Sequence, residues 1–62
     1  MTQESVRNRL IRHGEEKGVP LSFVGRKIGA PGYLLSKFKT NKRELWEATL
    51  LQLHDYLQKE GY

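Results

Sequence analysis

Two histidines, His13 and His54, are the side chains in this sequence that could carry acid–base or metal chemistry near neutral pH. A zinc site brings about three or four His, Cys, Asp or Glu ligands to one ion, usually at regular helical spacing when they share a helix. Neither histidine has such a set around it. His54 and its neighbour Asp55 project about 100° apart on a helix, so they do not form a catalytic pair. We therefore expect no metal site.

Nucleophilic side chains are equally isolated. Ser5, Ser22 and Ser36 have no base at a supporting spacing and no oxyanion loop nearby, and cysteine is absent. The glycines punctuate helices and form no phosphate-binding motif. A chain of 62 residues is also short for an enzyme with its own cleft, since single cores usually occupy about 100–150 residues. The sequence therefore predicts no enzyme, no catalytic residue and no cofactor.

Positive charge is the feature with a clear chemical use. The chain has 11 Lys and Arg against 7 Asp and Glu, a formal net charge of +4. No acidic residue lies between Lys17 and Arg43. The basic residues of this window are Lys17, Arg26, Lys27, Lys37, Lys39, Lys42 and Arg43. A chance run of solvated lysines is one interpretation. The other is a face for a polyanion, because uncompensated positive charge attracts phosphates and accelerates encounter with nucleic acid.

Composition also bounds the setting of the protein. Without cysteine there is no disulfide to stabilise the fold, so the core must hold by packing and helix signals, or with a second subunit. No stretch approaches the roughly 18 consecutive apolar residues that a membrane-spanning helix needs. The polar residues after Met1 show no signal-peptide pattern. We expect a single domain over residues 1–62, in a reducing, cytoplasmic setting and without a membrane partner.

Glycine and proline divide the chain into four predicted helices, at about 4–17, 21–28, 32–39 and 45–59. In the first, Thr2 is the expected N-cap and Gly18 the residue just past the end. Val6 and Leu10 lead an apolar stripe at helical spacing. Three arginines are expected to lie away from that stripe: Arg7, Arg9 and Arg12.

The second and third helices are short and joined by a tight turn. Val24 and Ile28 form an i, i+4 apolar pair, and Gly29 is expected at positive φ, where glycine has no steric penalty. In the third helix Leu35 and Phe38 face inward. The polar loop 40–43 follows, in which Asn41 can take the left-handed conformation.

The last helix carries more apolar residues than one packed stripe needs. Four of them fall within a narrow arc: Trp46, Leu50, Leu53 and Leu57. Leu51 projects from nearly the opposite side, and Tyr56 lies on a flank. We predict a dimer contact through Leu51 or Tyr56; scattered surface leucine is the alternative interpretation. Tyr62 is expected to be a loose chain end.

The ordered set of elements resembles the helix-turn-helix domain of the phage Cro and repressor family, the XRE-type DNA-binding domain. The resemblance is carried by Phe23-Val24-Gly25-Arg26-Lys27-Ile28-Gly29, Leu35-Ser36-Lys37-Phe38, Asn41-Lys42-Arg43-Glu44-Leu45, and Thr49-Leu50, Leu53 and Tyr56-Leu57. It implies a compact all-α, lambda-repressor-like domain of four or five helices. Gly25 would then lie where the second and third helices cross closely.

The resemblance also implies a function, which is sequence-specific DNA binding by a transcriptional regulator of the repressor type. The third helix would enter the major groove of double-stranded DNA as part of a homodimer. Residues carried over to base contacts are Gly32, Tyr33, Ser36 and Lys37. Those carried over to phosphate contacts are Ser22, Lys39, Thr40, Asn41, Lys42 and Arg43.

Three positions depart from the family pattern and keep other interpretations open. Pro31 stands where a Ser or Thr cap is common, Gly32 where a Gln or Arg often reads a base, and Leu34 is apolar where the family is usually polar. One alternative is a protein-binding module, such as an antirepressor, that uses Tyr33 and Leu34 as anchors. Another is sequence-independent DNA coating. RNA binding ranks last, because no aromatic pattern of an RNA-binding module is present.

Overall fold

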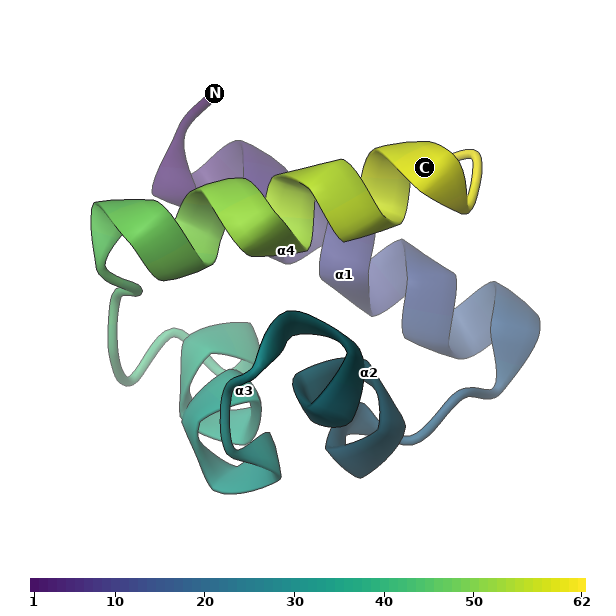
Figure 1. Cartoon of the computed structure of the whole chain (residues 1–62), viewed down its shortest axis with the longest axis horizontal. Helices are drawn as coiled ribbons and strands as arrows, with labels where there is room; N and C mark the ends of the chain where they lie inside the picture. The colour runs from purple at the N-terminus through teal and green to yellow at the C-terminus, as the bar shows by residue number, and fades with distance from the viewer.

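Four α-helices and no strand make up the computed structural model, which describes residues 1–62. They are α1 (Gln3–Lys17), α2 (Leu21–Ile28), α3 (Gly32–Lys39) and α4 (Glu47–Lys59). Figure 1 shows α1 and α4 side by side in one layer, with α2 and α3 packed together beneath them. The predicted all-α class with four helices is confirmed, and there is no fifth helix. No helix is long and apolar enough to cross a bilayer.

Capping residues define α1 as the sequence predicts. The Thr2 hydroxyl oxygen accepts a hydrogen bond from the Ser5 N–H at 3.0 Å, which satisfies one of the free donors at the helix start. Gly18 follows the last residue at φ 66°, and its N–H donates to the Gly14 carbonyl at 2.9 Å. Both caps were predicted, and both are confirmed.

The start of α4 differs from the prediction. The helix begins at Glu47, with Trp46 in the extended N-cap position and 74% exposed. Trp46 is therefore not a core residue, and the predicted stripe is wrong at that position. The physical reason lies at Leu45, which is buried: its backbone N–H donates to Gln3 Oε1 (3.0 Å), and its carbonyl accepts from Gln3 Nε2 (2.9 Å). This pairing fixes Leu45 in the core, and because Trp46 after it is extended, the two side chains point to opposite sides.

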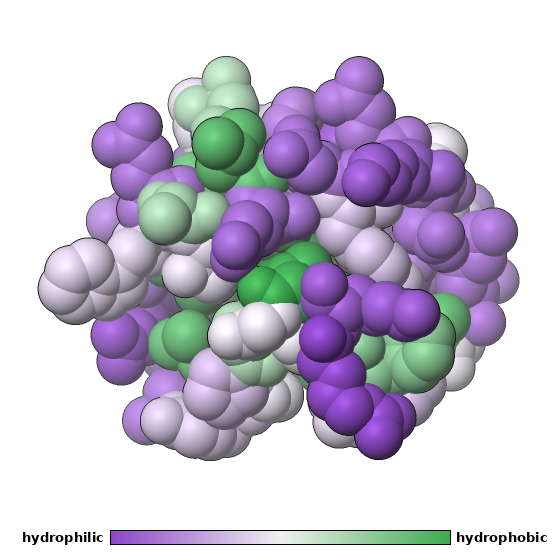
Figure 2. All heavy atoms as spheres, in the orientation of Figure 1, coloured by the Kyte–Doolittle hydropathy of each residue, from purple (hydrophilic) through white to green (hydrophobic).

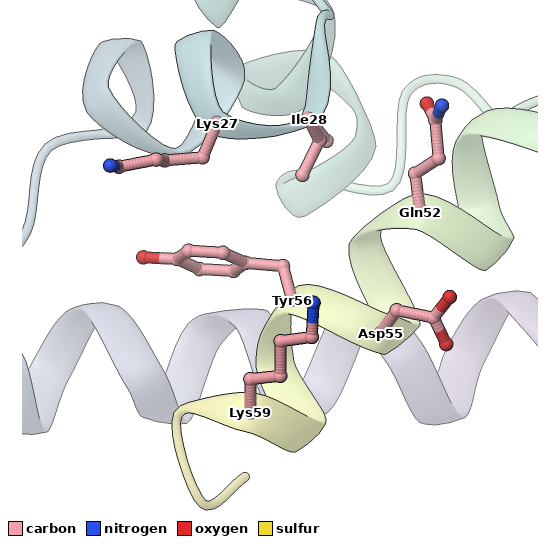
Figure 3. A pocket seen from close by; sticks show the side chains of 6 residues that line it. All are labelled: Lys27, Ile28, Gln52, Asp55, Tyr56 and Lys59. Carbon is pink, nitrogen blue, oxygen red and sulfur yellow. The ribbon is translucent and has the colours of Figure 1, made fainter.

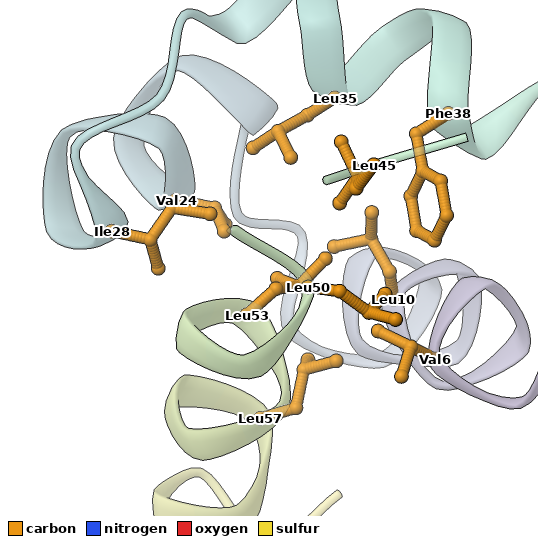
Figure 4. Packing of buried hydrophobic residues seen from close by; sticks show 10 residues of the cluster. All are labelled: Val6, Leu10, Val24, Ile28, Leu35, Phe38, Leu45, Leu50, Leu53 and Leu57. Carbon is orange, nitrogen blue, oxygen red and sulfur yellow. The ribbon is translucent and has the colours of Figure 1, made fainter. Parts of the chain in front are cut away.

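The hydrophobic core draws on all four helices and on this extended segment. Figure 4 shows its members converging between the two layers. The ten are Val6, Leu10, Val24, Ile28, Leu35, Phe38, Leu45, Leu50, Leu53 and Leu57. Burial of one such side chain contributes roughly 1.5–3 kcal/mol, so in a small domain the loss of any of them is serious.

The turn from α2 to α3 passes very close to Gly25 of α2. A Cβ atom on Gly25 would collide with the Ala30 carbonyl oxygen and lie 3.3 Å from the Gly32 nitrogen. The predicted tight approach at Gly25 is therefore confirmed, with the turn itself as the main neighbour. Gly29 has φ 76° and ends α2 in the left-handed conformation, also as predicted.

Residues after α4 fold back onto α1, which corrects the expectation of a loose end. The Tyr62 hydroxyl donates to Glu16 Oε1 at 2.7 Å, and the Tyr62 carbonyl accepts from Arg9 Nε at 2.6 Å. The Arg9 guanidinium also reaches His54 Nδ1 at 2.7 Å. The hydrogen bond to Glu16, with some loss of solvent, raises the pKa of the Tyr62 hydroxyl. The C-terminal turn, residues 60–62, thus holds the end of α4 against α1 by hydrogen bonds.

Candidate nucleic-acid interface

The outward face of α3 carries three of the four residues predicted to contact bases. Leu35 and Phe38 are fully buried, so they anchor the helix against the core. Tyr33 is 69% exposed, and Ser36 and Lys37 are exposed as well. The helix therefore presents an aromatic hydroxyl, an aliphatic hydroxyl and an ammonium group to solvent. Each of these can donate a hydrogen bond to an acceptor such as a base edge or a phosphate oxygen.

Gly32, the fourth predicted base-contact residue, is oriented differently. A Cβ atom there would lie 3.2 Å from the Ser22 Cα, so its side-chain direction is toward α2 and not toward solvent. The glycine allows the N-termini of α2 and α3 to approach closely. Any contact from Gly32 to a ligand would be made by its backbone. The same closeness places Ser22, an exposed predicted phosphate contact, beside the start of α3.

The loop after α3 has the predicted left-handed turn. Asn41 has φ 63°, and its N–H donates to the Phe38 carbonyl at 3.1 Å. The Lys42 N–H donates to the Lys37 carbonyl at 2.9 Å, which closes the turn on the helix. Lys42 and Arg43 are exposed, as are Thr40 and Asn41, whereas Lys39 is half-buried. The loop thus holds its two most exposed cations at the C-terminal end of α3.

Thr40 has a structural use that sequence reasoning did not assign to it. Its hydroxyl donates to the Ser36 carbonyl (3.0 Å), with the Lys37 carbonyl at 3.3 Å. The hydroxyl proton is therefore committed to the end of α3, where carbonyls lack helical partners. The Thr40 backbone N–H also donates to the Ser36 carbonyl, at 3.1 Å, so neither donor of Thr40 is free for a phosphate.

The positive charge of this surface has no internal compensation. The single contact between a basic side chain and a carboxylate within 4.0 Å joins His13 Nε2 to Glu60 Oε1, at 3.7 Å, and both residues lie outside the basic window. No Lys or Arg pairs with a carboxylate. The guanidinium and ammonium groups of the 17–43 window are therefore free of ion pairs and can attract an external anion.

Arg7 is a further residue whose predicted position is wrong. It was expected away from the apolar stripe, yet it is only 9% exposed. Its Nε donates to the Phe38 carbonyl at 2.7 Å, and its guanidinium carbon lies 4.7 Å from the centre of the Phe38 ring. Because α1 packs on α3 as well as on α4, its buried face is wider than one stripe. The periodicity of α1 alone cannot show that Arg7 stacks on Phe38, because Phe38 belongs to another helix.

The two histidines lie in different surroundings. His13 is fully buried, and neither ring nitrogen has a hydrogen-bond partner. Its ring packs edge-on against Tyr56 and Tyr62, at 5.5 and 5.3 Å between centroids. His54 is held by Arg9. No three His, Asp or Glu side chains gather where they could hold a metal ion.

A shallow groove runs between α2 and α4, with a volume of about 370 Å³. Figure 3 shows its lining from both helices: Lys27, Ile28, Gln52, Asp55, Tyr56 and Lys59. The groove is lined by one carboxylate, Asp55, and two lysines, Lys27 and Lys59. Tyr56, a predicted dimer residue, lines this groove and packs on His13, while Leu51 is 47% exposed on α4.

Polar residues cover most of the face seen in Figure 2, and apolar atoms show between them. The large apolar side chains that remain exposed are Met1, Phe23, Tyr33, Trp46 and Leu51. Comparisons with protein-family models, curated proteins and solved structures find no match for this chain.

Proposed function

We propose that this protein is a sequence-specific, double-stranded DNA-binding regulator of transcription of the repressor type. The observation that carries the proposal is the outward face of α3, where Tyr33, Ser36 and Lys37 are exposed beside a loop that presents Lys42 and Arg43. None of these cations is paired with a carboxylate. The resemblance of the helix order to the Cro and repressor family supports the same function.

In this mechanism α3 enters the major groove. Lys37 approaches the O6 and N7 acceptors of guanine, Ser36 donates or accepts, and the Tyr33 ring meets a thymine methyl group. Lys42 and Arg43 bind phosphates and fix the register of the helix, which adds affinity without sequence information. Ser22 and the free N–H groups at the start of α2 provide a further phosphate contact.

A homodimer would place two α3 helices in successive major grooves, about 34 Å apart. Regulation would then follow from occlusion or recruitment at an operator. The exposed Leu51 side chain on α4 is the surface that we assign to the dimer contact. Tyr56 contributes less exposed area, because its ring packs inside the chain against His13.

A second candidate is a protein-binding module on the same scaffold, and the exposure of Tyr33 favours it. A tyrosine that is 69% exposed can anchor a protein contact. Leu34, the other proposed anchor, is half-buried and packs against the core, so it offers little free surface. This candidate predicts that Tyr33→Ala abolishes binding to a protein, whereas Lys42→Ala and Arg43→Ala have little effect.

Selection from a randomised duplex library at about 0.15 M salt tests the proposal. The purified protein is mixed with the library, and the bound DNA is sequenced. A recovered motif, above all a palindrome with half-sites one helical turn apart, would support a dimeric, sequence-specific regulator. Bound DNA without a motif would instead indicate sequence-independent coating.

Failure to retain any duplex would contradict DNA binding and favour the protein-binding module. The Lys42→Ala/Arg43→Ala double variant is the control for this experiment. Both side chains are exposed and outside the core, so the variant should fold normally and lose retention of all duplexes together.

A further inference from the structure

Arg7 is a nearly buried cation with no anionic partner. It is 9% exposed, its Nε donates to the Phe38 carbonyl at 2.7 Å, and no carboxylate lies within ion-pair distance. Buried charges are normally paired, because removal from water disfavours the charged form. The carbonyl and the Phe38 ring compensate part of this loss. They leave most of the guanidinium without a partner.

The Nη donors of Arg7 have no acceptor within the protein. A guanidinium has five N–H groups, and in Arg7 only Nε–H has a protein acceptor. The buried side-chain nitrogens without a partner all belong to His13, so both Nη atoms of Arg7 reach water. The side chain as a whole is enclosed, at 9% exposed, and its Nη groups keep the donors that no protein acceptor uses.

The guanidinium of Arg7 lies next to the loop that we assign to phosphates. The Phe38 carbonyl that accepts from Arg7 also accepts from the Asn41 N–H, at 3.1 Å. Asn41 is followed directly by the exposed cations Lys42 and Arg43. Figure 4 shows the Phe38 ring projecting toward the helix that carries Val6 and Leu10. Arg7 of that helix and Asn41 of the loop thus meet at the Phe38 carbonyl.

We propose that Arg7 binds a backbone phosphate of DNA through its Nη groups, which makes α1 part of the interface. This inference rests on the proposed function. Arginine suits the task because its planar fork forms two parallel hydrogen bonds to phosphate. Here the fork is oriented in advance by the bond from Nε to Phe38 and by the ring beneath it. A phosphate held between Arg7 and the loop would also lock the end of α3 against α1.

The competing interpretation is that Arg7 only caps the C-terminus of α3, where a cation is favourable. The two interpretations differ in the salt dependence of DNA binding. Loss of a cap lowers stability, whereas loss of a phosphate contact lowers the slope of log Kd against log salt concentration by about 0.9 for each contact.

The test compares Arg7→Met with Arg12→Met. Both variants remove one positive charge from α1, and Arg12 is exposed and stacks on Tyr62 instead of Phe38. Binding to the duplex that the wild type retains best is measured at several salt concentrations, below the unfolding temperature of each variant. We expect the slope to fall by about 0.9 for each bound chain in Arg7→Met and to stay at the wild-type value in Arg12→Met.

Three results would overturn the inference, and they are distinguishable from one another. An unchanged slope in Arg7→Met, with normal DNA binding by the wild type, leaves the proposed function standing and removes Arg7 from the interface. An equal fall in both variants indicates a long-range charge effect. Absence of any duplex binding by the wild type contradicts the proposed function itself.

Arg7→Lys keeps the test informative if Arg7→Met does not fold. Lysine retains the charge but lacks the fork. The slope should then match the wild type, and the affinity should fall several-fold at every salt concentration, with a folded circular dichroism spectrum. Unchanged affinity in this variant would exclude a two-donor contact to phosphate.

Discussion

At the scale of single residues, the absence of a side chain can matter as much as its presence. Gly25 and Gly14 both lie inside helices, but only Gly25 faces a neighbour that a Cβ atom would strike, the Ala30 carbonyl. At Gly14 a Cβ atom meets nothing within 4 Å. Substitution at Gly25 therefore tests close packing, whereas substitution at Gly14 tests only the lower helix propensity of glycine.

Gly25→Ala is expected to destabilise the protein by about 1–3 kcal/mol, because the turn must shift to accept the methyl group. Gly14→Ala is the matched control and is expected to stabilise by roughly 0.5–1 kcal/mol, since alanine favours a helix interior. Urea unfolding at neutral pH measures both. Equal effects at the two positions would contradict the close approach of α2 and its following turn.

His13 is a second residue whose surroundings do not match its chemistry. It is fully buried against the rings of Tyr56 and Tyr62, and both ring nitrogens lack a hydrogen bond. We expect His13→Leu to raise the free energy of unfolding by about 1–3 kcal/mol, because leucine has similar size and no polar atom to satisfy. Thermal unfolding measures the change.

The control for His13 is His54→Leu. His54 Nδ1 lies 2.7 Å from Arg9 Nη1, so its loss removes a hydrogen bond and should not stabilise the protein. If His13→Leu destabilised the fold instead, the contact with Glu60 at 3.7 Å would have to contribute more than the missing hydrogen bonds.

At the scale of elements, helix α3 and the loop that follows it have separate tasks in the proposed function. Lys37 lies on the outward face of the helix, whereas Lys42 lies in the loop after Asn41. Base contacts carry sequence information, and phosphate contacts carry affinity and salt dependence. The same amino acid at these two positions should therefore give two different defects.

Lys37→Ala is expected to relax the preference at one base pair, at a cost of about 1–3 kcal/mol for the preferred base. Lys42→Ala should weaken binding to all duplexes about equally and reduce the salt slope by roughly one contact. Competition binding against single-base variants of the selected site measures both effects. If the loop variant changed the sequence preference and the helix variant did not, the docking orientation would be wrong.

At the scale of the whole molecule, the C-terminal turn holds the last helix, α4, against the first helix, α1. Tyr62 bonds to Glu16 and Arg9 of α1, while Tyr56 of α4 packs on His13. The pKa of Tyr62 is raised above 10.0 first by its hydrogen bond to Glu16, and the pKa of Tyr56 is raised mainly by burial and then by Glu60.

These shifts predict an alkaline limit to stability. Between pH 10.0 and the raised pKa values, the folded chain binds more protons than the unfolded chain. Stability therefore falls as pH rises through this range, and the contribution is complete below about pH 10. Tyr62→Phe should make the urea midpoint less sensitive to pH above 10 than in the wild type. An identical decline in both proteins would contradict a protonated Tyr62 hydroxyl bonded to Glu16.

Local signals in the sequence determined the helices of this protein and many of their ends. Thr2, Gly18, Gly29 and Asn41 act within one turn of the chain, so their conformations follow from residue type and position. The sequence also determined that Tyr33, Ser36 and Lys37 of α3 are exposed, because Leu35 and Phe38 set the inward face of this helix. The basic window is visible in the sequence as charge alone.

Only the tertiary structure decided the features that depend on contacts between distant segments. Gln3 pairs with the backbone of Leu45, so α4 begins only at Glu47 and Trp46 is exposed to solvent. Arg7 becomes buried because Phe38, far along the chain, supplies both a carbonyl and a ring. Periodicity describes one helix at a time, and the partner that covers a given side is set by how the helices pack.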